Sequence, residues 1–512
     1  MALGGRPRAG FEAVGMSRRA FLHAAGVGAA AAAVACTHGG RPGLPALSMP
    51  PEAGPNWSRL RSRLSGSLVL PGDADYAAAR RSFNRLFDGR RPAGVVLCVR
   101  PEDVQLAVEV AATSKLPIAA RSGGHSYAGY STPDQGLVVD LAKMAGVEVR
   151  PDGTAVVGAG TRLIDLYTAM AEAGRCLPAG TCPTVGIAGL TLGGGLGVLN
   201  RKLGLTCDRL LSATVVTSDA MLRTASTVSE PDLFWALRGG GGGNLGIVTA
   251  FEFSTERAPD LTVFSLGFPG GSVTSVLGGW QEWIQAAPDE LWSNCVVSAG
   301  RPPTCRVGGC FIGSVSALQP LLGELLRFSD TRPVRRFLRG MSCADAMRYF
   351  AHCSQRSVRQ CHLEGEPGGL LARESFVASS RVMARPIADP DRVASLLDRP
   401  AGVDALFDGL GGAVNRVAVG ATAFPHRTAI ATVQIYASAD EAHRQQAARV
   451  QAEVATGLGE LVGTGAYVNY LDPGLPDWAR AYYGPNLGRL REIAHRYDPD
   501  GVFSFPQGLT QA

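Results

Sequence analysis

Two side chains with nucleophilic chemistry stand in glycine-rich segments of the chain. His125 ends the run RSGGH, and Cys182 begins the run CPTVG. A neutral imidazole and a thiolate can each form a bond to an electron-poor carbon atom. A lone histidine is more often a hydrogen-bonding core residue, and a lone buried cysteine is more often inert. The occurrence of both in such segments favours a chemical role.

Glycine loops surround both residues and could enclose a dinucleotide, because free N–H groups in such loops can bind phosphate. Tight turns are the alternative for any single loop. The ordinary GxGxxG nucleotide motif is disfavoured, because Gly158 and Gly160 are followed by Leu163 where a third glycine is required. The candidate glycines are Gly123, Gly124, Gly186, Gly189, Gly193, Gly194, Gly195 and Gly197.

The two segments resemble those of the berberine bridge enzyme-like FAD-linked oxidases, which belong to the vanillyl-alcohol oxidase superfamily and have a PCMH-type FAD-binding domain. The similarity extends over most of the chain after about residue 85. It implies that His125 bonds the 8α-methyl group of FAD and that Cys182 bonds carbon six of the flavin ring. Two such bonds should make the flavin more oxidising, and about 30 mV corresponds to 1.4 kcal/mol for a two-electron couple.

The resemblance also implies the remaining FAD contacts. Val185 matches a position that controls oxygen access, where a small side chain is typical of oxidases; core packing is the alternative. Leu190 stands where many relatives have a histidine near the ribityl chain, so that hydrogen bond is expected to be missing. The other expected contacts are Arg121, Ser122, Ser126, Asn244, Gly246, Ile247, Val248 and Asn469, with the glycines above.

A tyrosine base is implied by the motif YVNYLDP, and we expect Tyr470 to be that base, with Tyr467 as second choice. Relatives with a glutamate base carry it just before an FPHR-like motif, where this chain has no carboxylate. Lowering the pKa of a tyrosine from about 10 by roughly three units requires about 4 kcal/mol of anion stabilisation. Arg427 and Arg381 are candidates to supply it. A packed tyrosine with a hydrogen-bonded hydroxyl is the alternative.

Alternating short strands and helices must position these residues. Apolar runs and periodic patterns predict strands at 94–99, 118–120, 137–141, 155–157 and 432–436, and helices that begin at Pro101 and Thr161. We therefore predict an α+β fold with two domains: a PCMH-type FAD-binding domain and a separate substrate domain built on an antiparallel sheet.

At 512 residues the chain is too long for one ordinary core. Its composition changes along the sequence, and no internal repeat is present. The segments we predict are an export signal at 1–36, a proline-rich linker at 37–56, the FAD-binding domain at 57–257, the substrate domain at 258–465, and a C-terminal berberine bridge-like segment at 466–512 that returns to complete the FAD domain.

The amino terminus predicts export. Arg18 and Arg19 precede the apolar run 24–35, which is too short to span a bilayer and resembles the twin-arginine signals that export folded proteins. Cleavage could follow Ala35, or Cys36 could carry a lipid anchor. We expect an extracellular or periplasmic protein.

Net charge and cysteine content limit the kinds of binding partner and cross-link that we expect. The formal net charge is +5, of which the first 36 residues carry four arginines against one glutamate, so the rest of the chain is nearly neutral. That balance gives little reason to bind nucleic acid or acidic membranes. Six cysteines cluster between Cys295 and Cys361, where export would permit disulfides of unassigned pairing, and free buried thiols are the alternative. We expect no metal site, because no CxxC pair occurs.

These observations predict an oxidase that carries covalent FAD, takes a small-molecule substrate and uses oxygen as acceptor. Tyr470 would take a hydroxyl proton while hydride passes to flavin N5. A sugar or oligosaccharide is the expected substrate. The alternatives are an aromatic or polyketide alcohol, and a flavin dehydrogenase that passes electrons to a partner protein.

The export signal can be tested directly. Arg18→Lys together with Arg19→Lys should retain the protein inside the cell, because the twin-arginine system reads the guanidinium pair and not charge alone. Cell fractionation measures the result, and unchanged secretion would reject this route. Mass analysis of the mature amino terminus separates cleavage after Ala35 from lipidation of Cys36.

Overall fold

The computed structural model describes residues 54–512. The predicted export signal, Cys36 and residues 37–53 of the predicted linker lie outside the described residues. In residues 54–512, no helix has both the length and the apolar character that are needed to cross a membrane.

A four-stranded mixed sheet carries the His125 loop. The first elements are α1 (Trp57–Arg63), β1 (Ser67–Val69), α2 (Tyr76–Ala79), η1 (Arg85–Phe87), β2 (Gly94–Leu97), α3 (Pro101–Thr113), β3 (Ile118–Arg121) and β4 (Leu137–Asp140). The strand order is β1-β2-β4-β3, and β2, β4 and β3 are parallel. Helix α3 packs here because Val104, Ala107, Val108 and Ala111 share one buried face, and Pro101 is favourable in its first turn.

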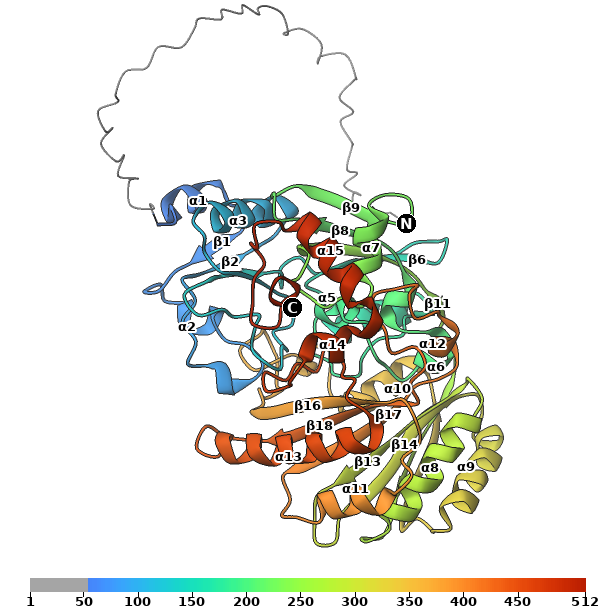
Figure 1. Ribbon diagram of the computed structural model, residues 1–512. Coiled ribbons are helices and arrows are strands. Elements are labelled where there is room, and N and C mark those ends of the chain that lie inside the picture. Colours follow the sequence, from blue (N-terminus) through green and yellow to red (C-terminus); the bar gives the residue numbers. More distant parts are fainter. Residues whose placement is uncertain (1–53) are drawn as a thin grey trace, which may run out of the picture. The chain divides into compact units, whose positions relative to one another are not determined.

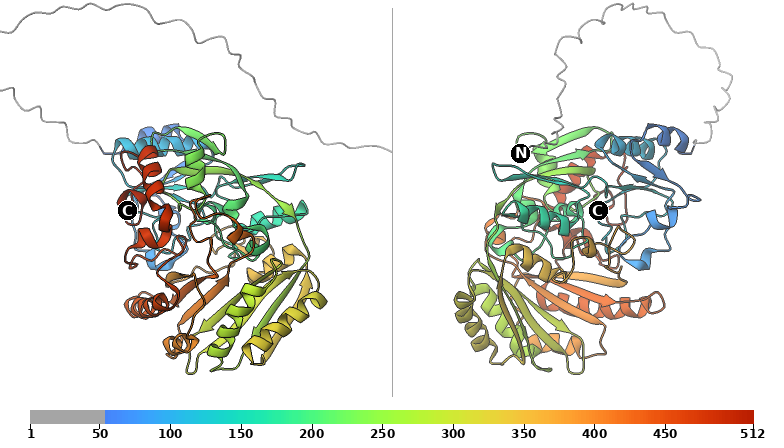
Figure 2. Two further views of the ribbon diagram at one scale, coloured as in Figure 1. Left: turned by 45° about the vertical axis from the view of Figure 1, so that its right-hand side comes forward. Right: turned by 180° about the vertical axis from the view of Figure 1, so that it is seen from behind.

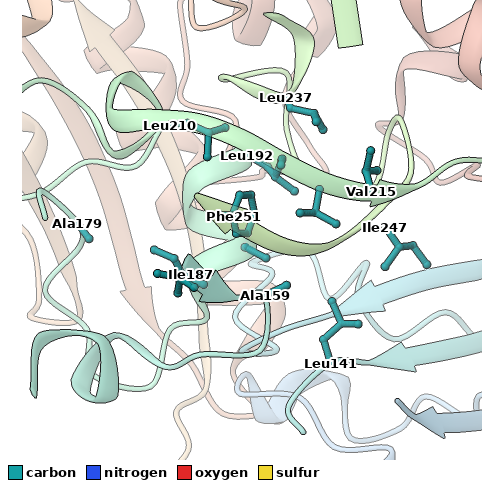
Figure 3. Close-up of a cluster of buried hydrophobic side chains, with 14 of the residues drawn as sticks. Leu141, Ala159, Ala179, Ile187, Leu192, Leu210, Val215, Leu237, Ile247 and Phe251 are labelled. Atoms are coloured by element: carbon teal, nitrogen blue, oxygen red, sulfur yellow. The ribbon is translucent and has the colours of Figure 1, made fainter. Parts of the chain in front are cut away.

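A five-stranded antiparallel sheet lies next along the chain. Its strands are β5 (Val147–Val149), β6 (Thr154–Gly158), β8 (Leu210–Val216), β9 (Leu222–Ser226) and β10 (Ile247–Ser254), in the order β5-β6-β10-β8-β9. The other elements of residues 163–257 are α4 (Leu163–Glu172), β7 (Arg175–Cys176), α5 (Ile187–Leu192), α6 (Asn200–Leu203), η2 (Thr206–Arg209), α7 (Pro231–Leu237) and β11 (Glu256–Arg257). Apolar side chains from both sheets and α5 form one core, which includes Leu141, Ile187 and Phe251 (Figure 3).

A seven-stranded antiparallel sheet forms a separate layer in the lower half of Figure 1. Its strands are β12 (Leu261–Gly267), β13 (Leu291–Ser298), β14 (Thr304–Ile312), β15 (Arg335–Met341), β16 (Phe376–Met383), β17 (Val403–Gly409) and β18 (Ala431–Ser438), in the order β15-β12-β14-β13-β17-β18-β16. The helices between them are α8 (Val273–Ala286), α9 (Val315–Ser329), α10 (Cys343–Phe350), η3 (Arg359–Cys361), α11 (Pro390–Leu397), α12 (Ala413–Arg416) and α13 (Arg444–Val462).

The two faces of this sheet have different surroundings. Helices α8, α9, α11 and α13 pack on one face, where they and alternate strand residues form a second apolar core (Figures 1 and 2). Because side chains alternate along a strand, the residues between those core positions face the other way. Asn294, Asp408 and Gln434 are on that second face.

The C-terminal elements are α14 (Trp478–Tyr483), η4 (Gly484–Asn486), α15 (Leu487–Tyr497) and η5 (Leu509–Gln511). They contact the five-stranded-sheet region: Arg489 and Arg496 both pair with Asp232, at 2.9 and 2.7 Å, and the N–H of Leu509 donates to Oδ1 of Asn244 at 2.9 Å. The end of the chain thus lies against a region far earlier in the sequence.

The predicted fold class is confirmed: the chain is α+β, with a separate antiparallel sheet. The predicted strands correspond to β2, β3, β4, β6 and β18, and the helix expected from Pro101 is α3. The helix expected from Thr161 begins at Leu163 as α4. The exact domain boundaries stay a prediction.

Candidate active site

His125 lies in the loop between β3 and β4 and is partly buried. Its Nε2 atom is 2.9 Å from Oγ1 of Thr184, and its ring stacks on Phe83 with the ring centroids 3.8 Å apart. Burial, followed by the positive charge of Arg162, lowers the pKa of His125 to about 3. The imidazole is therefore neutral at physiological pH and keeps a lone pair for bond formation.

Cys182 precedes α5 and reaches the same threonine. Its Sγ atom is 3.8 Å from Oγ1 of Thr184. Burial raises the pKa of the Cys182 thiol, whereas hydrogen bonds from Thr184 and from the Val185 N–H act to lower it. The structure thus brings the two predicted nucleophiles together around one hydroxyl group.

Two glycines let these segments touch. A Cβ atom at Gly123 would lie 2.2 Å from the N atom of Gly186, and a Cβ atom at Gly186 would lie 1.9 Å from Oγ of Ser122. Such overlaps exclude any larger residue while the contact is kept. Ser122 is fixed in turn, because its hydroxyl donates to the Ala159 carbonyl at 2.6 Å.

Aromatic rings from separate segments meet beside Cys182. Tyr470 stacks on Tyr127, with centroids 5.3 Å apart and 8° between the ring planes, and it meets Tyr467 edge to face at 5.0 Å. Gln434 donates to the hydroxyl of Tyr127 at 2.5 Å. Burial raises the pKa of both Tyr127 and Tyr470, and the nearby Cys182 adds to that rise. The predicted base therefore lies in the same site as the predicted nucleophiles.

Asp408 on β17 is a site residue that the sequence analysis missed. Burial raises the pKa of its carboxyl to about 7, although a hydrogen bond from Asn294 and the charge of Arg306 act to lower it. Asp408 also contributes to the raised pKa of Tyr470, after burial and Tyr127. The alternation of apolar residues along 403–409 is the signal that could have placed this carboxylate on a sheet face.

The cations expected to stabilise a Tyr470 anion are engaged elsewhere. Arg427 donates to Asp208 through two hydrogen bonds of 2.8 and 2.7 Å, and Arg381 donates to the Ser380 carbonyl at 2.6 Å. Burial instead raises the pKa of Tyr470 well above its ordinary value of 10.0. The expectation of a cation-stabilised tyrosinate is therefore wrong. A base function of Tyr470 needs a proton acceptor, and Asp408 is the carboxylate whose charge acts on Tyr470.

Tyr467 and Asn469 support a glycine loop. The hydroxyl of Tyr467 accepts hydrogen bonds from the N–H of Gly195 at 3.0 Å and from Nδ2 of Asn469 at 2.9 Å. Nδ2 of Asn469 also donates to the carbonyl of Leu190 at 3.0 Å. The second-choice tyrosine is thus bound to the protein itself.

Three other predicted contact residues form hydrogen bonds or ion pairs with neighbouring parts of the protein. Arg121 is 5% exposed and pairs with Asp140 at 2.7 Å. The hydroxyl of Ser126 accepts the Tyr130 N–H at 3.1 Å, and Asn244 donates to the Gly240 carbonyl at 2.9 Å. The remaining predicted residues lie in the loop before β10 (Gly246), on β10 (Ile247, Val248), in the His125 loop (Gly124), on α5 (Gly189), and in the loop after it (Gly193, Gly194, Gly197).

A charged network fastens the segment before β16 next to this site. His362 lies 3.0 Å from both Glu366 and Asp165, which flank its two ring nitrogens. These hydrogen bonds raise the pKa of His362 to about 9. Arg162 joins the network, 3.4 Å from Glu366 and 2.7 Å from the Ser122 carbonyl.

A disulfide joins Cys353 to Cys361 in the same segment. The other four cysteines of the cluster are free: Cys295, Cys305, Cys310 and Cys343. The sequence left this pairing open. The disulfide closes residues 353–361 into a loop, and His362 connects this segment to Asp165 of α4.

Comparison with known proteins matches two family models, an FAD binding domain at residues 92–226 and a "berberine and berberine like" domain at 466–510. An uncharacterized FAD-linked oxidoreductase of Bacillus subtilis, YgaK, is 32% identical over 88% of this chain and 98% of its own length. The xylooligosaccharide oxidase of Thermothelomyces thermophilus is 33% identical over 82% of this chain and 88% of its own length.

A solved structure adds a chemical detail. Glucooligosaccharide oxidase from Acremonium strictum, described with a 6-S-cysteinyl, 8α-N1-histidyl FAD, superposes with a TM-score of 0.79 and 26% sequence identity. The alignment covers 87% of this chain and 97% of that protein. Its fold is therefore shared over nearly the whole described part.

The His362 network gives a pH prediction. The folded pKa of about 9 is above the ordinary 6.5, so its stabilising contribution is complete below about pH 6.5 and is lost as pH rises through 9. The N–H of Glu364 donates to the Leu371 carbonyl and the N–H of Leu371 donates to the His362 carbonyl. The protection factors of these two amides should fall about tenfold between pH 8 and pH 10.

Hydrogen exchange corrected for intrinsic rates measures this change. The variant His362→Gln should lose the pH dependence. His443→Gln, at an exposed histidine paired with Asp440, should keep it. A parent protein with equal protection factors at pH 8 and pH 10 would contradict the assignment.

Proposed function

Because the chain belongs to the berberine bridge enzyme-like family of FAD-linked oxidoreductases, in the vanillyl-alcohol oxidase superfamily, we propose that it is an oxidase with one FAD bonded to both His125 and Cys182. The substrate is a carbohydrate or another alcohol, and oxygen is the acceptor. The observation that carries the proposal is the shared contact of His125 Nε2 and Cys182 Sγ with the Thr184 hydroxyl.

The residues present fit a doubly bonded flavin. The Thr184 hydroxyl is hydrogen bonded to Nε2 of His125, whereas within residues 54–512 the Nδ1 atom of His125 has no hydrogen-bond partner. We assign Nδ1 as the bonding nitrogen, because burial keeps the ring neutral. Burial raises the pKa of the Cys182 thiol, and the Val185 N–H and the Thr184 hydroxyl oppose that rise by stabilising the thiolate, which is the reactive form of a cysteine.

Bound FAD supplies the two-electron oxidation of the substrate carbon, with oxygen as the final acceptor. Tyr470 takes the proton of the substrate hydroxyl and passes its own to Asp408, whose pKa of about 7 suits a proton acceptor near neutral pH. This relay avoids a free tyrosinate, which the burial of Tyr470 would make costly. Val185, beside Cys182, leaves oxygen access to the ring.

The proposal also assigns the parts of the chain. Residues 57–257 and 466–512 hold the cofactor, residues 258–465 bind the substrate, and residues 1–36 direct export to the periplasm or the outside of the cell. The glycine segments and Asn469 line the flavin, with Arg121 and Asn244 as supports of that frame.

The covalent attachment is tested by acid precipitation. Flavin should stay with the polypeptide, and one cross-linked peptide pair with His125 and Cys182 should carry its mass. Either single alanine variant should keep one bond and lower the reduction potential, where roughly 30 mV corresponds to a tenfold change in the equilibrium. The double variant should lose most of its flavin. Complete release of FAD from the parent protein by acid would refute the proposal.

The proton relay is tested by Tyr470→Phe and Asp408→Asn. Tyr470→Phe should keep fold and flavin while anaerobic flavin reduction slows by roughly 10²–10⁴, the usual range for general-base catalysis. The parent rate should fall below about pH 7 as Asp408 becomes protonated, and Asp408→Asn should remove that step. The rate of reoxidation by oxygen should hardly change.

Tyr467→Phe is the matched control. It removes a hydroxyl that accepts the Gly195 N–H, so it should reduce thermal stability and leave the reduction rate within a few-fold of the parent. If Tyr467→Phe slows flavin reduction and Tyr470→Phe does not, the base is Tyr467. If neither slows it, the proposed relay is wrong.

A further inference from the structure

The second face of the seven-stranded sheet continues outward from Asp408. Directly paired residues share a face of a sheet, and the register makes one cross-strand row of Asp408, Asn294, Gly308, Ser265 and Phe337. Four strand spacings separate Asp408 from Phe337, which is roughly 19 Å. The row therefore leads from the candidate active site to the free edge strand β15.

A parallel row of the same face carries two arginines. Arg335 on β15 pairs with Gly267, which pairs with Arg306 on β14. A Cβ atom at Gly308 would lie 2.9 Å from a terminal nitrogen of Arg306 and 3.3 Å from Oδ1 of Asn294. The guanidinium of Arg306 thus lies over a position without a side chain, next to the partner of Asp408.

Both arginines are exposed and unpaired. In the part of the chain that the structure describes, neither Arg306 nor Arg335 forms an ion pair or a side-chain hydrogen bond, so their guanidinium donors are free, and the charge of Arg306 acts on Asp408. A guanidinium with free donors binds carboxylate in a planar, two-point geometry.

The need to keep an edge strand from pairing with another chain does not explain why both arginines are present. Charges on an edge strand hinder pairing with another chain, and this suffices for Arg335. Arg306 is different, because β14 is separated from that edge by β12. Its guanidinium lies over Gly308 on the face of the sheet, so it does not protect the edge strand.

An aromatic pair ends the row. Phe337 is 37% exposed and stacks on Tyr349 of α10, with centroids 5.2 Å apart and ring planes within 2°. A flat, rigid ring of this kind offers apolar surface to the apolar face of a sugar ring at little conformational cost. Between it and Asp408 the row holds only small or polar residues: half-buried Asn294 and Ser265, and buried Gly308 under the guanidinium of Arg306.

We propose that this surface binds an acidic oligosaccharide, with its oxidised end at Asp408, carboxylates of the following sugar units on Arg306 and Arg335, and a distal unit on Phe337. The surface of Asn294, Gly308, Ser265, Phe337, Arg306 and Arg335 is called the arginine strip. This inference rests on the proposed function, because it names the class of carbohydrate that the same site takes: oligomers that contain uronic acids.

The test compares charged and neutral forms of one substrate. Tetramers of glucuronate, galacturonate and mannuronate are each paired with their methyl ester, and kcat/KM is measured with the FAD-loaded enzyme. At least one acid should be preferred over its ester by roughly tenfold, at a few-fold for each exposed arginine contact, and the preference should shrink with added salt. Arg306→Gln with Arg335→Gln should bring that ratio close to one.

Arg336→Gln is the matched control, because Arg336 pairs with the core residue Leu266 and so lies on the opposite face of the same strand. It should leave the ratio unchanged. A parent ratio near one, or an equal loss in Arg336→Gln, overturns the arginine strip even if neutral sugars are oxidised, in which case the proposed function stands.

Calorimetry of the FAD-loaded protein with the same tetramers distinguishes failure of the arginine strip from failure of the proposed function. If no sugar reduces the flavin but an acid binds and the double variant abolishes binding, the strip stands and the proposed oxidation of carbohydrate is wrong. If no acid binds or reduces the flavin, the strip is refuted.

Discussion

The contact between the His125 loop and the Cys182 segment is the constraint on which the site depends. Gly123 and Gly186 bring the two backbones so close that neither position has room for a side chain. Only this approach lets Thr184 reach both nucleophiles with one hydroxyl. The two sheets behind the loops, with their common core, hold the segments at that spacing, since packed interiors deform little.

Burial sets the protonation states in this site more than ion pairing does. It keeps His125 neutral, keeps Tyr470 protonated, and brings Asp408 to the middle of the physiological range. These effects have opposite signs because burial disfavours the charged form of every group. An uncharged imidazole is useful for bond formation, and a carboxyl group with a pKa near 7 is useful for proton transfer. A buried arginine beside Tyr470 would have had its own desolvation cost.

The sequence predicted the elements and the nucleophiles better than it predicted the base. Short apolar runs located β2, β3 and β4, and the helical spacing of Val104, Ala107, Val108 and Ala111 located α3. The meeting of His125 with Cys182 came from motif resemblance. The predicted cations were wrong because the partner of Arg427, Asp208, lies 219 residues away in the sequence, and Arg381 donates to a backbone carbonyl. Asp408 was missed because its proximity to Tyr470 depends on packing between distant segments.

Sheet register links the two functions assigned to residues 258–465. Asp408 and Arg306 face the same side because β17, β13 and β14 pair in one register, and a shift by one residue would turn each side chain of the moved strand toward the helices. The apolar core under α8, α9 and α13 opposes any such shift, since it would expose Phe407 or Val307 and bury a charge. The same core that stabilises the sheet therefore fixes the positions of Asp408 and Arg306, the residues for which we propose roles in proton transfer and in binding of substrate carboxylates.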